Sequence, residues 1–262
     1  MYEDLKALYE VGGLKKYILL LVRSCSLCES MTKTKISPPI FPIRSYSPNE
    51  RYTMDYTQFA PNVWFLIVIA NFSKRVWGDV YPTKQEKNVI CFLEEIMDTE
   101  GTFCEILQSD NGGEFIGNDL KAFLKGKCIA IHGRPFHPQS QATIERFNGT
   151  IKTIVTKYCK SRNVTVFSIE ELQPVLKICL DIYMRQIHSS TNFRPYELHY
   201  GIVLATLRPM FDYRNFDVDC IHHSMLGTRR SEDEIRKMRA TASRNQCKRN
   251  ARNFKQAYLK HL

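Results

Sequence analysis

The chain has 262 residues, of which 44% are hydrophobic and 24% charged, so it can bury the core of one sizeable domain and carry smaller appendages. Its formal net charge of +10 favours a polyanionic partner, nucleic acid before a membrane. The apolar run at 17–22 is too short for a signal peptide or a membrane span, and nine cysteines without a secretory signal indicate a reducing compartment.

The first 31 residues are predicted to form a helix that leads into Cys25-Ser-Leu-Cys28. Two thiolates at this spacing supply half of a tetrahedral zinc site, and no histidine precedes His132 to complete it. A structural thiol pair is the alternative. Four prolines between positions 38 and 48 indicate an extended linker. We therefore expect a small helical remnant with a partial zinc site at 1–35 and a linker at 36–50.

A sheet is predicted to begin after this linker. Strand patterns cover 52–59, 63–70 and 75–81, and the short connections between them indicate an antiparallel meander. The second run, VWFLIVIA, is continuously apolar, which is typical of a central strand buried on both faces. Four more elements are predicted after this meander: a helix at 83–98, a strand at 103–110 that ends in Asn111-Gly112-Gly113, a helix at 118–124 and a strand at 128–132.

The stretch 132–158 is predicted to begin as extended chain and to continue after Pro138 as a long helix, which a second helix at 168–187 follows. One face of the first helix is apolar at a helical period, with Ile144, Phe147, Ile151, Ile154, Val155 and Tyr158. Beside it runs a polar stripe of Gln141, Glu145, Asn148 and Lys152. Such a row suits a phosphate-handling site at the rim of a cleft, and a solvated helix face is the alternative.

This order of elements predicts an α/β fold, a ribonuclease-H-like mixed five-stranded sheet flanked by helices. In that layout the first and fourth strands are adjacent at the sheet centre, and the long helix packs against them. Asp55 in the first strand, Asp110 at the end of the fourth and Glu145 at the helix start would then meet. Because clustered carboxylates repel one another, we expect Mg²⁺ or Mn²⁺ there, as two ions about 3.5–4 Å apart that promote phosphoryl transfer.

The C-terminal part, 206–262, is predicted to be a basic helical tail. After an acidic start the stretch has no acidic residue beyond Glu234, and it carries many lysines and arginines, among them Arg236, Lys237, Lys248 and Arg249. Such cations release counterions when they contact phosphates, so we expect non-specific DNA binding here. A solvated helix is the alternative.

Three sequence motifs then carry a family resemblance. MDY with Asp55, QSDNGGEF at 108–115 and HPQSQATIERFNGTIK at 137–152 resemble the integrase core of retroviruses and gypsy-class LTR retrotransposons. TNFRPYELHYG at 191–201 is similar to the closing helix motif of that family, and RSCSLC at 23–28 to the second half of its HHCC zinc module. The resemblance supports a catalytic core at 51–205 and origin as a fragment of a retroelement Pol polyprotein.

The resemblance implies a function and a set of site residues. Asp55, Asp110 and Glu145 match the metal-binding triad, and Asn111 and Gly112 match the turn beside the second aspartate. DNA contacts are implied for Asn111 in this turn and for the loop and helix residues His137, Gln139, Gln141, Asn148 and Lys152. The family reaction is 3′-end processing by water, followed by attack of the freed hydroxyl on target DNA. Partners would be double-stranded element ends, target DNA and further copies of the chain, in the nucleus and not at a membrane.

Some features depart from the family pattern. Ala142 stands where the family usually has glycine, the histidine pair of the zinc module is absent, and no β-rich module follows the basic helix. These departures motivate a second hypothesis, an integrase-derived nucleic-acid-binding protein without catalysis. A ribonuclease that cleaves RNA–DNA hybrids is a third, which fits the layout but not the 137–152 motif. His188 is interpreted as structural, as are Cys91, Cys104, Cys128, Cys159 and Cys179.

Overall fold

The computed structural model describes residues 6, 12–25, 45–133, 142–163, 168–202 and 229–260. The chain divides into two compact units, Met1–Phe41 and Pro42–Leu262. In the first unit, helix α2 spans Leu14–Ser24 and begins after Gly13, which has a left-handed backbone. Within the described ranges, none of the helices combines the length and the apolar character that crossing a membrane requires.

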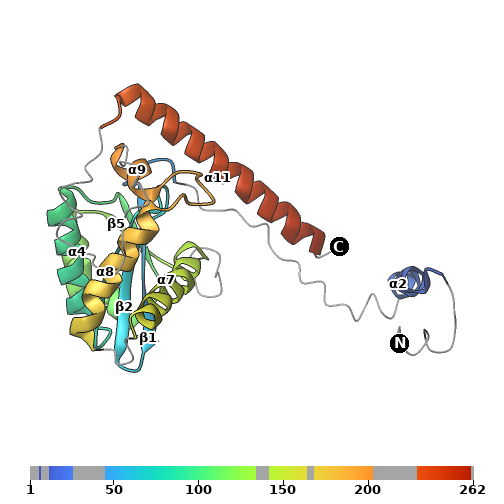
Figure 1. Ribbon diagram of the computed structural model, residues 1–262, viewed down its shortest axis with the longest axis horizontal. Helices are drawn as coiled ribbons and strands as arrows, with labels where there is room; N and C mark the ends of the chain where they lie inside the picture. The colour runs from blue at the N-terminus through green and yellow to red at the C-terminus, as the bar shows by residue number, and fades with distance from the viewer. Residues whose placement is uncertain are drawn as a thin grey trace. The chain divides into compact units, whose positions relative to one another are not determined.

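The second unit is built on one five-stranded sheet (Figure 1). Strands β1 (Arg51–Ala60), β2 (Val63–Ala70) and β3 (Val76–Tyr81) form the predicted antiparallel meander. Strands β4 (Ile106–Ser109) and β5 (Ile129–His132) continue the sheet in parallel with β1. The strand order β3-β2-β1-β4-β5 puts β1 in the middle and next to β4, as the sequence predicted.

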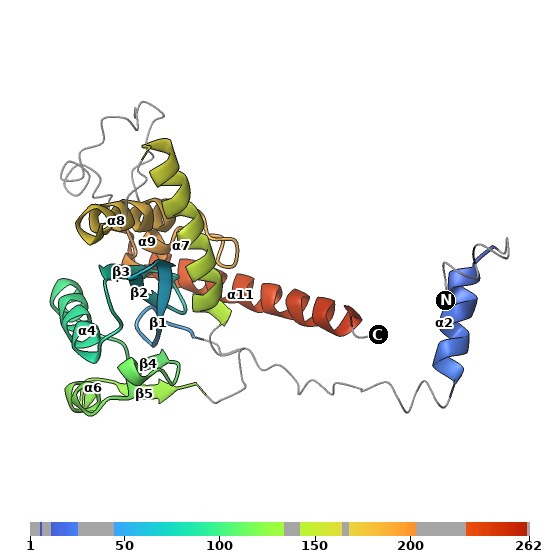
Figure 2. The same cartoon turned by 90° about the horizontal axis from the view of Figure 1, so that it is seen from below.

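Helices cover both faces of the sheet (Figures 1 and 2). One face packs against α4 (Glu86–Glu100) and α6 (Asn118–Leu124), which follows the short helix α5 (Gly113–Ile116). The other packs against α7 (Ala142–Ser161) and α8 (Ile169–Arg185). The remaining helices are α9 (Pro195–Tyr200) and α11 (Glu232–Lys260).

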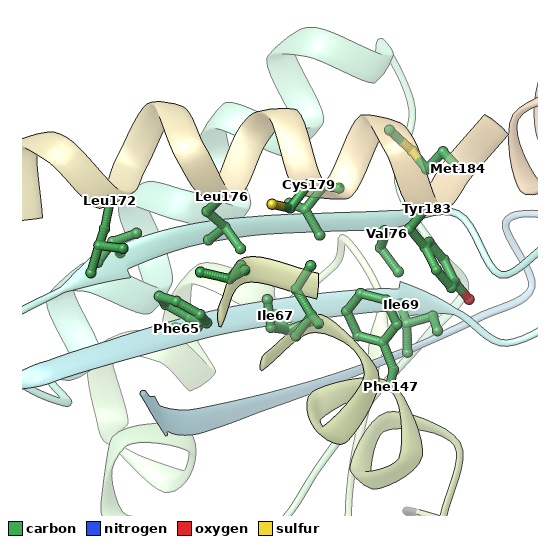
Figure 3. Close-up of a cluster of buried hydrophobic side chains, with 14 of the residues drawn as sticks. Phe65, Ile67, Ile69, Val76, Phe147, Leu172, Leu176, Cys179, Tyr183 and Met184 are labelled. Atoms are coloured by element: carbon green, nitrogen blue, oxygen red, sulfur yellow. The ribbon is translucent and has the colours of Figure 1, made fainter. Parts of the chain in front are cut away.

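Strand β2 contributes to both cores because its side chains alternate between the two faces. Phe65, Ile67 and Ile69 pack against α7 and α8, while Leu66 and Val68 pack against the α4 side. Figure 3 shows the first of these cores, with the side chains of α8 above the strands. The prediction of a central strand buried on both faces is therefore confirmed.

Several element ends differ from the sequence prediction. Helix α4 begins at Glu86 and not at 83, and it ends at Gly101, whose left-handed backbone lets its N–H bond to Met97 O at 2.9 Å. The strand predicted at 103–110 shortens to β4, and α5 was not predicted. Helix α8 begins just after Ser168, which forms a capping box with Glu171.

Helix α11 packs against the rest of the second unit by its first half. Met238 and Ala242 are buried with Leu198 of α9 and Phe72 of the β2–β3 turn. At its start, the side chain of Ile235 lies close over Gly201, where an added Cβ would meet Ile235 Cδ1 at 2.5 Å. The part of the chain that we predicted as a basic tail therefore includes a helix that packs on the core.

Candidate active site

Asp55 lies on the central strand β1, on the face that α7 covers. Tyr52, Met54 and Tyr56 face the α4 side, so the alternation of the strand turns Asp55 the other way. Its half-buried carboxylate accepts a hydrogen bond at Oδ2 from Asn148 Nδ2, 2.8 Å away. This bond attaches the middle of the sheet to the second turn of α7 and fixes the orientation of the carboxylate.

Asp110 follows β4 directly, at the end of the strand adjacent to β1. Its Oδ1 accepts a hydrogen bond from Gly112 N–H at 2.9 Å, so the carboxylate caps its own turn. A side chain at 112 would crowd both carboxylates, because an added Cβ would lie 3.0 Å from Asp110 Oδ1 and 2.9 Å from Glu114 Cδ. Asn111 Nδ2 donates to Gly133 O at 2.7 Å and so joins the ends of β4 and β5.

The predicted polar stripe of α7 lies beside its buried face. Glu145 is exposed in the first turn, Asn148 is 7% exposed and Lys152 is half-buried. Asn148 Oδ1 is buried and has no hydrogen-bond partner among the described residues. An unpaired acceptor next to a carboxylate cluster suits a cation or its water ligands, since a buried oxygen without a partner is otherwise unfavourable.

The electrostatics of the site show that the three acids are near one another. Burial is the main reason that the pKa of Asp55 rises from 3.8 to about 7; the negative charges of Asp110 and Glu145 contribute to this rise, and the hydrogen bond from Asn148 opposes it. A raised carboxyl pKa means that the ionised form lacks positive charge around it. Carboxylate and amide oxygens are ligands that Mg²⁺ and Mn²⁺ prefer, so the donor set fits a hard divalent cation.

The described side chains do not form a closed metal cluster. Within the described ranges, no group of three histidine, cysteine, aspartate or glutamate side chains is arranged to hold a metal ion. The acids thus share one electrostatic environment without converging on one point. Cys25, at the end of α2, is half-buried. Its partner Cys28 and the predicted contacts His137, Gln139 and Gln141 lie outside the described residues.

Sequence reasoning missed Glu114 as a neighbour of the site. Its carboxylate lies beside Gly112 and forms an ion pair with Lys84, Oε1 to Nζ 3.1 Å. The Gly-Gly-Glu order after Asp110 is the signal that could have indicated it, because two small residues let a carboxylate fold back over the turn. Lys84 balances the charge of Glu114, so this acid adds little to the excess charge around Asp55.

The predicted DNA contacts of the C-terminal part lie on α11. Arg236, Lys237 and Lys248 are exposed, and Arg249 is half-buried. Arg236 lies 3.7 Å from Asp233 in a pair exposed to solvent, which contributes little to stability. These four cations are therefore placed where a polyanion can reach them.

Comparisons with known proteins agree with this site and fold. Residues 45–138 match the family model of the integrase core domain, a range that contains Asp55 and Asp110. The chain is 28% identical over 197 residues to the Pro-Pol polyprotein of simian foamy virus type 3 (strain LK3), covering 72% of this chain and 16% of the relative. It is 28% identical over 219 residues to the Pol polyprotein of radiation murine leukemia virus (strain Kaplan), covering 76% and 36%. The chain thus spans well under half the length of these relatives.

A solved structure shares the fold. A chain of the simian T-cell lymphotropic virus intasome, in complex with PP2A regulatory subunit B56 gamma, aligns with a TM-score of 0.59 over 82% of this chain and 75% of that chain, at 17% identity. This likeness concerns the fold alone, and it confirms the predicted ribonuclease-H-like sheet flanked by helices. Residues 45–138 thus match the integrase core domain, and the chain is similar in sequence to Pol polyproteins of a foamy virus and a retrovirus.

Proposed function

We propose that this protein is a retroelement integrase, which catalyses metal-dependent processing of the 3′ ends of element DNA and their transfer into target DNA. The observation that carries the proposal is the placement of the acids: Asp55 lies on the middle strand, bonded to Asn148 of α7, and Asp110 ends the adjacent strand, in a range that matches the integrase core domain. An uncompensated acidic group of this kind is where a polynucleotidyl transferase would need divalent ions.

Each residue of the site has a proposed role. Asp55, Asp110 and Glu145 would hold the divalent ions. Two Mg²⁺ or Mn²⁺ ions would supply Lewis acidity at the attacking and leaving oxygens of the phosphodiester. Asn148 orients the Asp55 carboxylate through the 2.8 Å bond. The Gly112 N–H holds Asp110 in the same way.

The proposal also includes partners and a compartment. Double-stranded DNA would lie along α7, where Lys152 can contact a phosphate, and along the exposed basic residues of α11. We propose a homo-oligomer as the working form, since transferring two ends requires two sites, and the nucleus as the place of action. The zinc site at Cys25 and Cys28 stays a prediction.

The test is strand transfer from a duplex that carries the element's terminal sequence, in the presence of Mg²⁺ or Mn²⁺. Asp110→Asn should reduce the rate by a factor on the order of 10³ or more, because it removes a charged metal ligand. Asp119→Asn, an exposed carboxylate on α6, is the control with the same change of charge. Equal activity of Asp110→Asn and the wild type would refute the assignment.

A non-catalytic nucleic-acid-binding protein derived from an integrase is the other candidate. Two results together would support it over the enzyme. The protein would bind DNA without metal and would not transfer strands, and calorimetry would show no Mn²⁺ binding that depends on Asp110. The exposed cations of α11 serve either function, so DNA binding alone does not distinguish the two.

A further inference from the structure

Helix α11 is held against the core by side-chain bonds as well as by its apolar residues. Asn245 Nδ2 donates to Thr191 O at 2.9 Å, in the loop between α8 and α9. Gln246 Nε2 donates to Phe72 O at 2.7 Å, in the β2–β3 turn. Because a helix turns once in 3.6 residues, Arg249 follows these two residues on the same face, one turn further along.

This placement brings Arg249 to a group of cationic side chains from other elements. The β2–β3 turn, α7 and the loop between α8 and α9 each contribute one residue, and in both views this loop lies between α7 and α11 (Figures 1 and 2). We call the group the basic cluster, and its members are Lys74, Arg146, His188 and Arg249.

Electrostatics confirm that the members of the basic cluster are close together. Burial, together with the charges of Lys74, Arg249 and Arg146, lowers the pKa of His188 from 6.5 to about 4. Burial and the charge of Arg146 together lower the pKa of Lys74 to about 8. Among the described residues, neither Lys74 nor Arg249 forms an ion pair with a carboxylate, so positive charge accumulates here.

The donors of the cluster are oriented. The Lys74 ammonium donates to Asn71 O at 2.6 Å, and the left-handed backbone of Lys74 (φ 65°) sets this position in the tight turn. The Ser190 N–H donates to His188 Nδ1 at 3.2 Å, so the neutral ring carries its proton on Nε2. His188 therefore adds a hydrogen-bond donor without a charge.

The basic cluster adjoins the acidic site. Arg146 is the residue after Glu145 on α7. Asn71, whose carbonyl accepts from Lys74, also accepts a hydrogen bond at Oδ1 from Thr53 of β1, at 2.9 Å. Thr53 lies two residues before Asp55 on the same face of the strand, so Lys74 is linked through Asn71 to the strand face that carries Asp55.

We infer that the basic cluster binds one backbone phosphate of the DNA strand held at the acidic site, and that docking of α11 completes it. Phosphate oxygens accept from lysine, arginine and histidine donors and relieve the repulsion between like charges. The carboxylates of the acidic site by themselves repel DNA phosphates, so a phosphate-binding site beside them would keep the strand in place. This inference rests on the proposed function, because it names how the same site holds its substrate.

The test measures equilibrium binding of a blunt-ended DNA duplex in EDTA, where no catalysis takes place. Lys74→Gln and Arg249→Gln should each lower the affinity about tenfold at low salt and reduce the slope of log K against log salt by about 0.9. The matched control is Lys121→Gln, which removes one positive charge from an exposed position on α6, on the opposite face of the sheet from α7. Thermal melts of all three variants check that they fold.

Single neutral methylphosphonate substitutions along the duplex locate the contact. A methylphosphonate at one position should weaken binding to the wild type. The same methylphosphonate should not weaken binding to Lys74→Gln or Arg249→Gln, because these variants have already lost a contact to that phosphate. If these variants behave like Lys121→Gln, or if no such position exists, the inference is wrong even for a protein that transfers strands. If the position exists but metal-dependent strand transfer is absent, the phosphate site stands and the proposed catalysis fails.

Discussion

At the scale of single residues, Asp55 determines the chemistry that the site can support. Its carboxyl group is half-buried among two other acids and one amide, and its pKa of about 7 leaves it largely protonated at mildly acidic pH. A divalent cation has to displace this proton in order to bind. Metal affinity should therefore rise as the pH increases through 7.

The same shift predicts how stability depends on pH. Because the pKa of Asp55 is higher in the folded state than in the unfolded one, its contribution is fully present below pH 3.8 and is lost as the pH rises through 7. Without divalent ions, Asp55→Asn should be more stable than the wild type at pH 8 by on the order of 3 kcal/mol, and not at pH 3.5. Urea unfolding at both pH values measures this difference, with Asp119→Asn as a control that shows none.

At the scale of elements, one buried carboxylate joins helices from different parts of the second unit. Glu100, the last residue of α4, has a side chain that is 6% exposed. It accepts hydrogen bonds from Trp77 Nε1 at 2.8 Å and from Tyr200 OH at 2.7 Å, and it pairs with Arg75 at 3.4 Å. Arg75 also lies over the Trp77 ring, 4.6 Å from its centroid. This network attaches α9 to β3 and α4.

Glu100→Gln should destabilise the protein by about 3–5 kcal/mol, because it leaves the Arg75 guanidinium buried without a counter-charge. Glu94→Gln, on the exposed face of the same helix, should change the free energy of unfolding by less than about 0.5 kcal/mol. Chemical denaturation of both variants makes the comparison. Equal effects would mean that the network does not hold α9 in place.

At the scale of the second unit, α11 packs through a small contact at one end. Phe72, Leu198, Met238 and Ala242 form this contact, and within the part of the chain that the structure describes, three side-chain hydrogen bonds cross it, from Arg239, Asn245 and Gln246. A helix with so little buried surface should open more readily than the sheet. Its basic residues would then be presented to DNA by an element that can detach.

Met238→Ala should weaken this docking by about 2 kcal/mol, which corresponds to roughly thirtyfold faster amide exchange in the first half of α11. Exchange in β1 and β2 should stay unchanged, because their cores do not contain Met238. Lys237→Ala, an exposed neighbour, serves as the control. Faster exchange throughout the sheet would show that α11 is instead part of the cooperative core.

The sequence by itself determined the elements whose signals are local. The apolar run of β2, the stripe Ile144-Phe147-Ile151 of α7 and the start of α8 after Ser168 follow from periodicity and capping, which neighbouring residues encode. The motifs around Asp55, Asp110 and Glu145 also carry the resemblance to the integrase core, and residues 45–138 match the model of that domain. Element ends were less accurate, because Gly101 and the β4 pairing decide them through contacts outside the local pattern.

Only the tertiary structure decided how distant residues meet. It showed that Asn148 holds Asp55, that Glu114 folds back beside Gly112, and that the described acids do not close into a ligand cluster. It also placed α11 on Phe72 and Leu198 and so brought Arg249 to Lys74, 175 positions earlier in the chain. No local pattern marks Lys74 or His188, since each is a single polar residue in a turn or loop. Their proximity arises from burying apolar surface elsewhere, and a sequence read in order contains no local signal for that.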